Sequence, residues 1–200
     1  MKKSFANLFI VLTAAASFCG FTTAVFGQTN AAAKLLDAAK ASSDSQLGGI
    51  ASELAGKAQS LGSAVGTNTA VTGGLNSTLS ALAGGQDSAA LASAFKLASA
   101  AKLTPEQLGL AKQVGNLASA YVVQKNFAAL DGAQDDVATI VSSLRSGKIQ
   151  PALPALKNVA ASAKLTDTQK QLITTIADKY APGLGKAGGA VESLKKLPGF

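Results

Sequence analysis

Two short stretches of this chain resemble each other and indicate how it folds: AAKLTPEQ at positions 100–107 and SAKLTDTQ at positions 162–169. Each joins the lysine-terminated end of an alanine-rich segment to the pattern Thr-x-x-Gln. This pattern is typical of a helix start, because each side chain can bond a free backbone amide at the other residue. A lysine in the last turn suits the negative end of a helix dipole. Each stretch therefore predicts a helix end, a short connection and a new helix, which form a helical hairpin.

The spacing of apolar residues predicts helices along the rest of the chain. Alanine has the highest helix propensity, and leucine, lysine and glutamine follow it closely. Apolar residues recur in steps of three and four, which places each set on one helix face. The sets are Ile50, Leu54, Leu61 and Val65; Leu91, Phe95 and Ala98; Leu110, Val114, Leu117 and Tyr121; Val137, Val141 and Leu144; and Leu172, Ile176 and Tyr180. We predict an all-α fold of about eight or nine helices.

The two stretches are parts of a longer internal repeat. At a shift of 62 residues, the correspondence extends to leucines, alanines and glycines on both sides of the stretches. The corresponding pairs are Leu82 and Leu144, Gly85 and Gly147, Leu91 and Leu153, Ala98 and Ala160, and Leu110 and Leu172. A fainter copy lies upstream, where Ser43 begins the sequence Ser-Asp-Ser-Gln, 61 residues before Thr104.

We therefore predict three tandem copies of a three-helix unit, which span about residues 31–85, 86–147 and 148–199. Each unit has an alanine-rich helix, a capped helix and a short helix that ends at glycine or at Lys-Leu-Pro-Gly. Such units can stack as a short α-solenoid or close into one helical bundle, and the sequence is compatible with both. Turns between helices are predicted at Gly84-Gly85, Asp131-Gly132, Gly147 and Pro182-Gly183.

The first 27 residues have the pattern of a secretory signal peptide. Lys2 and Lys3 precede an apolar stretch, and Val25 and Gly27 are small enough for the −3 and −1 positions of a cleavage site. A second possible cleavage site follows Ala24. Serine, threonine and glycine interrupt the apolar stretch too often for a transmembrane span of ~20 residues. We expect residues 28–200 to form a single helical domain that is periplasmic or secreted.

The composition of residues 28–200 limits the chemistry that the protein can perform. These residues contain no cysteine, methionine, histidine or tryptophan, and their net charge is +5. Without histidine and cysteine, the chain lacks the commonest general base, the thiolate nucleophile and most transition-metal ligands. A Ser–Lys dyad is the hydrolytic arrangement that remains possible. Ser93 and Lys96 match it by spacing alone, on a helix face that we expect to be exposed.

Asp135 and Asp136, with Asp131 nearby, are the only acidic cluster. Their spacing lacks the alternating oxygen ligands and the closing glutamate of a calcium loop. We therefore interpret them as favourable charge in the first turn of a helix, rather than as a divalent-cation site. The sequence thus predicts no catalytic, cofactor-binding or metal-binding residues.

The remaining features concern partners. The lysines are dispersed and there is one arginine in the chain, whereas nucleic-acid recognition usually needs a concentrated basic face, so we predict no nucleic-acid partner. Dispersed lysines permit weak, salt-sensitive contact with an anionic membrane. Tyr121, Phe127 and Tyr180 either line a pocket or fill wide gaps in a core of small residues, and we favour the second role.

We expect an exported, non-catalytic helical protein of the bacterial cell envelope, with a binding or structural role. Its partner would be an unknown protein, an envelope polymer or a second copy of the chain. One alternative is a peripheral protein that lies on membranes or envelope polymers through amphipathic helices. A second alternative is a Ser–Lys hydrolase.

Overall fold

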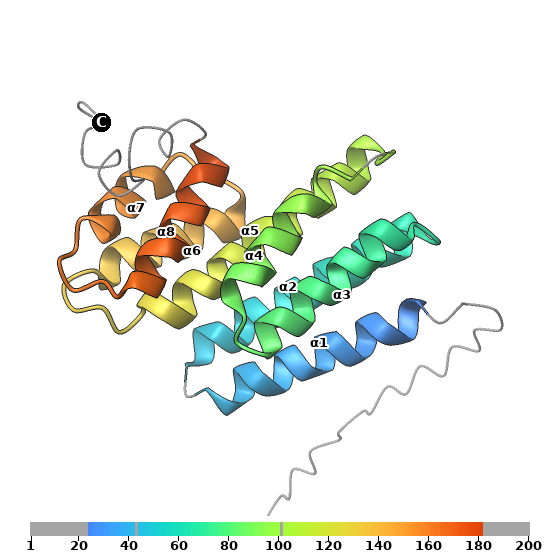
Figure 1. Cartoon of the computed structure of the whole chain (residues 1–200), viewed down its shortest axis with the longest axis horizontal. Coiled ribbons are helices and arrows are strands. Elements are labelled where there is room, and N and C mark those ends of the chain that lie inside the picture. The colour runs from blue at the N-terminus through green and yellow to red at the C-terminus, as the bar shows by residue number, and fades with distance from the viewer. Residues whose placement is uncertain (1–23, 43, 101, 182–200) are drawn as a thin grey trace, which may run out of the picture.

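The computed structural model describes residues 24–42, 44–100 and 102–181, with side chains from Thr29 onward (Figure 1). Over these residues it contains eight α-helices and no strands, and the helices pack into a bundle. The predicted all-α class is therefore confirmed. The helices are α1 (Ala24–Ala41), α2 (Ser45–Val65), α3 (Thr69–Ala83), α4 (Asp87–Leu97), α5 (Pro105–Phe127), α6 (Gln134–Ser146), α7 (Ala152–Ala160) and α8 (Asp167–Tyr180).

The first five helices form two layers. Helices α1, α3 and α4 lie side by side, and α2 and α5 pack together behind them (Figure 1). Helices α6, α7 and α8 pack in series against one end of this arrangement, where α6 contacts α5 and α8 contacts α4. Among the described helices, none combines the length and the apolar character that crossing a bilayer requires.

Helix α5 is the central element of the bundle. It packs against α2, α4 and α6 and also contacts α3 and α8. The sequence predicted one apolar face, but every residue from Leu117 to Gln124 is buried. A stretch of helix that is buried on all sides shows no clean apolar stripe, so the spacing predicted too narrow a face for the second half of α5.

Helices α2 and α5 run antiparallel, and at each end of the pair a glutamine of α5 forms a hydrogen bond that joins the two helices. Near the start of α5, Gln107 Nε2 donates a hydrogen bond to the Ala64 carbonyl at 2.7 Å. Near its end, Gln124 Nε2 donates to Asp44 Oδ2 at 2.6 Å. Because the two bonds lie at opposite ends of the pair, they fix the register of α5 against α2.

Both predicted capping boxes are present. Thr104 Oγ1 accepts from the Gln107 amide at 3.3 Å, and Gln107 Oε1 accepts from the Thr104 amide at 2.9 Å. At the start of α8, the corresponding distances between Thr166 and Gln169 are 3.2 and 2.9 Å. Gln169 Nε2 also donates to the Asn126 carbonyl at 2.7 Å. In both boxes the accepting carbonyl lies 43 residues before the glutamine.

The two helix pairs that these glutamines join are otherwise unequal. Helices α2 and α5 share a long interface, whereas α5 and α8 share a short one, because α8 packs mainly against α4 and α7. Matching local sequence therefore produces the same helix start twice without the same packing along the whole helix.

One other predicted helix boundary differs from the structure, and three predicted turns agree with it. The N-cap of α2 is Asp44, not Ser43, and its carboxylate accepts from the amides of Gln46 and Leu47. A carboxylate suits this position because it can accept two bonds and carries charge that the helix dipole favours. Turns occur as predicted at Gly85, Gly132 and Gly147, which have φ of 73°, 78° and 71°.

Three predicted features lie outside the described residues. They are the signal peptide up to residue 23, the turn at Pro182-Gly183 and the short helix that closes the third unit. The backbone of α1 begins at Ala24 and continues through both predicted cleavage positions.

Candidate functional site

Two adjoining pockets lie along the exposed side of α5. The first, which we call the aromatic pocket, has a volume of about 290 Å³ and is lined by α4, α5, α8 and the segment after α6. The second, the polar pocket, has a volume of about 600 Å³ and is lined by α2, α5 and α6. Asn116 and Gly147 line both pockets, so we call the two together the α5 groove.

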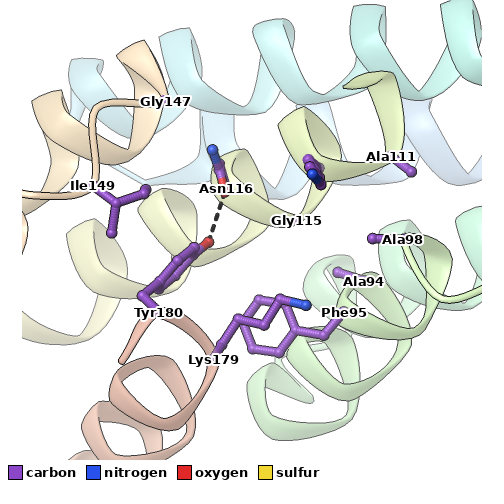
Figure 2. Close-up of a pocket in the computed structure, with 11 residues that line it drawn as sticks. Ala94, Phe95, Ala98, Ala111, Gly115, Asn116, Gly147, Ile149, Lys179 and Tyr180 are labelled. Carbon is purple, nitrogen blue, oxygen red and sulfur yellow. Dashed lines mark hydrogen bonds between the residues drawn. The ribbon is translucent and has the colours of Figure 1, made fainter. Parts of the chain in front are cut away.

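The aromatic pocket is built around Phe95 and Tyr180 (Figure 2). Their rings meet edge to face, with centroids 6.1 Å apart and an interplanar angle of 83°. Lys179 Nζ lies 5.3 Å from the centre of the Phe95 ring, within the range of a cation–π contact. Ile149 lines the pocket from the segment after α6. The pocket therefore has aromatic and aliphatic walls, with the exposed lysines Lys112 and Lys179 at its edge.

Tyr180 connects α8 to the middle of α5. Its hydroxyl donates to Asn116 Oδ1 at 2.9 Å and lies 3.2 Å from Ser119 Oγ. Burial raises the pKa of Tyr180 to about 12, although the hydrogen bond with Ser119 opposes this shift. The phenol therefore stays protonated at neutral pH and acts as a donor to Asn116.

This hydrogen bond also orients the amide of Asn116. Because Oδ1 faces Tyr180, Nδ2 lies on the side away from the ring, as Figure 2 shows. Asn116 Nδ2 lies near the position that a side chain at Gly147 would occupy, at 3.8 Å. Within the described part of the chain this nitrogen has no hydrogen-bond acceptor, so a donor is available in the wall that the two pockets share.

The polar pocket contains one ion pair. Arg145 donates to both carboxylate oxygens of Glu53, through Nε at 3.1 Å and through Nη2. This hydrogen bonding raises the pKa of Arg145. Glu53 is therefore neutralised across the gap between α2 and α6. The other exposed polar residues of the lining are Lys57, Ser60, Gln113 and Ser146.

A separate polar cluster holds α4 against the end of α5. The Asp87 side chain is 9% exposed, and its carboxylate accepts from Lys125 Nζ at 3.0 and 3.1 Å and from Asn126 Nδ2 at 2.9 Å. This cluster was not predicted from the sequence. The sequence does contain one indication of it, the three adjacent polar residues Gln124 to Asn126 at the end of an apolar helix. Their partners could not be inferred, because they lie tens of residues earlier in the chain.

Ser93 and Lys96, the spacing match to a Ser–Lys dyad, both line a third pocket of about 270 Å³ between α3 and α4. Ser93 is half-buried and Lys96 is exposed. No hydrogen bond joins them in the described structure.

The acidic cluster is divided among structural contacts. Asp135 and Asp136 lie in the first turn of α6, as predicted. Asp136 Oδ1 accepts from Asn158 Nδ2 at 3.1 Å, and Asp131 pairs with Lys164 at 3.2 Å. Among residues 24–42, 44–100 and 102–181, no three or more histidine, cysteine, aspartate or glutamate side chains gather in a way that could hold a metal ion.

The aromatic residues have two different roles. Tyr121 and Phe127 are 2% and 0% exposed in the core, which confirms the core-filling role predicted for them. The prediction was wrong for Tyr180, which lines the aromatic pocket because α8 ends beside the middle of α5. Phe95 and Asn116 were also not predicted to be pocket residues. Phe95 could have been noticed as the one aromatic residue of an alanine-rich helix. Asn116 could have been noticed as an amide side chain within an apolar helix.

Comparison of the chain with protein-family models, curated proteins and solved structures finds no match.

Proposed function

We propose that the protein is an exported, non-catalytic binding protein of the bacterial cell envelope and that the α5 groove is its binding surface. The observation that carries this proposal is the pair of adjoining pockets that share Asn116 and Gly147. Ligand sites are typically concave and mostly apolar, with a few well-placed polar groups. The aromatic pocket has this composition, and the unpartnered amide nitrogen of Asn116 supplies a polar group.

The walls of the groove are held in place by the fold. Helix α5 is pinned to α2 at both ends through Gln107 and Gln124, and Tyr180 ties α8 to its middle. A site on well-packed helices is more precise than one on loops, because neighbouring side chains restrict its rotamers. This supports a pocket that exists before the ligand arrives.

The proposal includes the tandem three-helix repeat. The two capping boxes and their matching bonds to carbonyls 43 residues upstream support a repeated unit. In this interpretation the groove draws on all three units. Glu53 belongs to residues 31–85, Phe95 and Asn116 belong to residues 86–147, and Tyr180 belongs to residues 148–199.

Export is supported by the signal pattern in the first 27 residues. The mass of the protein recovered from the envelope tests it: a chain that begins at Val25 or Gln28 supports cleavage. A chain that retains residue 1 and stays in the cytoplasm would contradict it.

Site-specific photo-cross-linking in producing cells tests the binding surface. A benzophenone side chain replaces the exposed Gln113 in the groove, and Ala33, which is exposed on α1, serves as the control position. We expect a discrete foreign adduct from position 113 and none from position 33. Adducts to the chain itself would indicate a self-assembling structural protein. Equal foreign adducts from both positions, or no adduct at all, would also contradict the proposal.

A further inference from the structure

We propose that the aromatic pocket binds a small organic anion in which a flat apolar group carries a carboxylate or phosphate. This inference rests on the proposed binding function and specifies its ligand class. The apolar group would lie against the contacting rings of Phe95 and Tyr180 and against Ile149. The anionic group would lie beside Lys112 and Lys179, with Asn116 Nδ2 as a donor in the wall shared with the polar pocket.

The shape of the pocket comes from small residues where α4 faces α5. Gly115 is the clearest case, because a Cβ atom there would lie 3.6 Å from Phe95 Cδ1 and would reduce the space. Ala94, Ala98 and Ala111 also line the pocket. The volume of about 290 Å³ is at the lower end for ligand pockets, which favours a small ligand.

The charge around the pocket is positive and unbalanced. Lys112 and Lys179 are exposed at its edge, and neither pairs with a carboxylate of the described residues. The acidic residue of the adjoining polar pocket, Glu53, is already neutralised by Arg145. Asp178 precedes Lys179 in the sequence but does not line the pocket. An anionic group on the ligand would compensate this charge.

Two features position these cationic and polar groups before any ligand binds. The Phe95 ring holds Lys179 Nζ at 5.3 Å from its centre, and the Tyr180 hydroxyl turns Asn116 Nδ2 away from itself. The same two aromatic side chains thus form the apolar wall and orient the polar groups. A neutral apolar ligand would leave Lys112, Lys179 and Asn116 Nδ2 without a new partner.

The experiment compares 2-naphthoate with 2-naphthamide, which have the same ring and nearly the same shape but differ in charge. Binding to the purified protein is followed by NMR through the backbone amides of Gly115 and Gly147, which line the pocket. We expect 2-naphthoate to bind about fivefold more tightly than 2-naphthamide, as partly exposed ion pairs allow.

Matched variants assign this preference to the pocket. Lys112→Gln should reduce this preference, because only Lys179 then remains as a cation at the pocket, whereas Lys34→Gln, which removes the same charge from α1, should leave it unchanged. Gly115→Ala should weaken both compounds. Gly109→Ala makes the same change in α5 where a Cβ atom would meet nothing within 4 Å, and should weaken neither.

The outcomes separate this inference from the proposed function. Equal affinity for the two compounds would overturn the anion preference, while a cross-link from position 113 would still support the groove as a binding surface. Shifts confined to residues outside the pocket, or no binding of either compound, would overturn the inference. Binding of 2-naphthoate with the expected variants but no cross-link in cells would overturn the proposed cellular role instead.

Discussion

At the level of single residues, Tyr180 links the aromatic pocket to the stability of the fold. Its phenol is a donor to Asn116 only while it is protonated. The same burial that shields the ring raises its pKa to about 12, compared with about 10 in an unfolded chain. Between these two values, the folded protein keeps a proton that the unfolded chain has lost.

Stability should therefore fall as the pH rises through this window, because the unfolded state binds fewer protons than the folded state. We expect the free energy of unfolding to fall by about 2 kcal/mol between pH ~10 and pH 12, because the buried phenolate is disfavoured in the folded state. Tyr180→Phe cannot titrate, so the difference in unfolding free energy between wild type and this variant should shrink over the same range. Urea unfolding of both proteins at a series of pH values measures this difference in unfolding free energy. A difference that stays constant throughout would contradict the burial of the phenol.

Asp87 is the second residue whose surroundings predict a measurable effect. Lys125→Met should lower the free energy of unfolding by about 2 kcal/mol, because the buried carboxylate then keeps only the amide of Asn126. The control is Lys170→Met, whose ion pair with Asp167 is exposed and should have no measurable effect. Equal effects of the two substitutions in chemical denaturation would show that the Asp87 cluster does not anchor α4.

At the level of helices, the capping boxes hold the starts of α5 and α8. Thr104→Ala and Thr166→Ala should each lower the free energy of unfolding by about 1 kcal/mol, because each removes a side-chain acceptor for a free amide. Gln107→Ala should cost more, about 2 kcal/mol, since it also removes the bond to Ala64. Thr104→Ser keeps the hydroxyl and is the control. Unchanged unfolding midpoints for both alanine variants would contradict these helix starts.

The contact between α3 and α4 depends on one of two adjacent glycines. A Cβ atom at Gly73 meets nothing within 4 Å, whereas one at Gly74 would lie 2.8 Å from Cδ2 of the buried Leu97. Gly73→Ala should stabilise the protein by about 0.5–1 kcal/mol through helix propensity. Gly74→Ala gains the same propensity but displaces Leu97, so it should be less stable than Gly73→Ala by about 1 kcal/mol or more. Thermal unfolding compares them, and equal midpoints would mean that the Leu97 side chain does not restrict the space at Gly74.

At the level of the whole molecule, the position of α1 predicts how cleavage of the signal peptide affects the stability of the fold. Its buried residues Ala31, Leu35 and Ala39 all follow the predicted cleavage sites. Chains that begin at Val25 and at Gln28 should therefore unfold at the same temperature. A chain that begins at Asp44 lacks α1 and uncovers apolar residues of α2 and α3, so its midpoint should fall. Circular dichroism measures all three, and a Gln28 chain that melts like the Asp44 chain would place essential contacts before residue 28.

Several features of the fold could be predicted from the sequence because they depend on residues close together in the chain. The helix starts at Thr104 and Thr166 need only a glutamine three residues later. The turns at Gly132 and Gly147 need only a residue that accepts a positive φ. The acidic first turn of α6 is also a local effect, since the helix dipole acts on the nearest side chains.

The pocket residues could not be predicted in this way, because their partners are distant in the chain. Asn116 and Tyr180 are 64 residues apart, and Gln124 bonds Asp44 across 80 residues. No spacing rule connects such pairs, since side-chain contacts across a bundle depend on how helices cross and on where each one ends. Local hydrogen bonding and apolar spacing thus define the helices of this protein. The long-range packing around α5 places Phe95, Asn116 and Tyr180 in one pocket, because it brings the end of α8 beside the middle of α5.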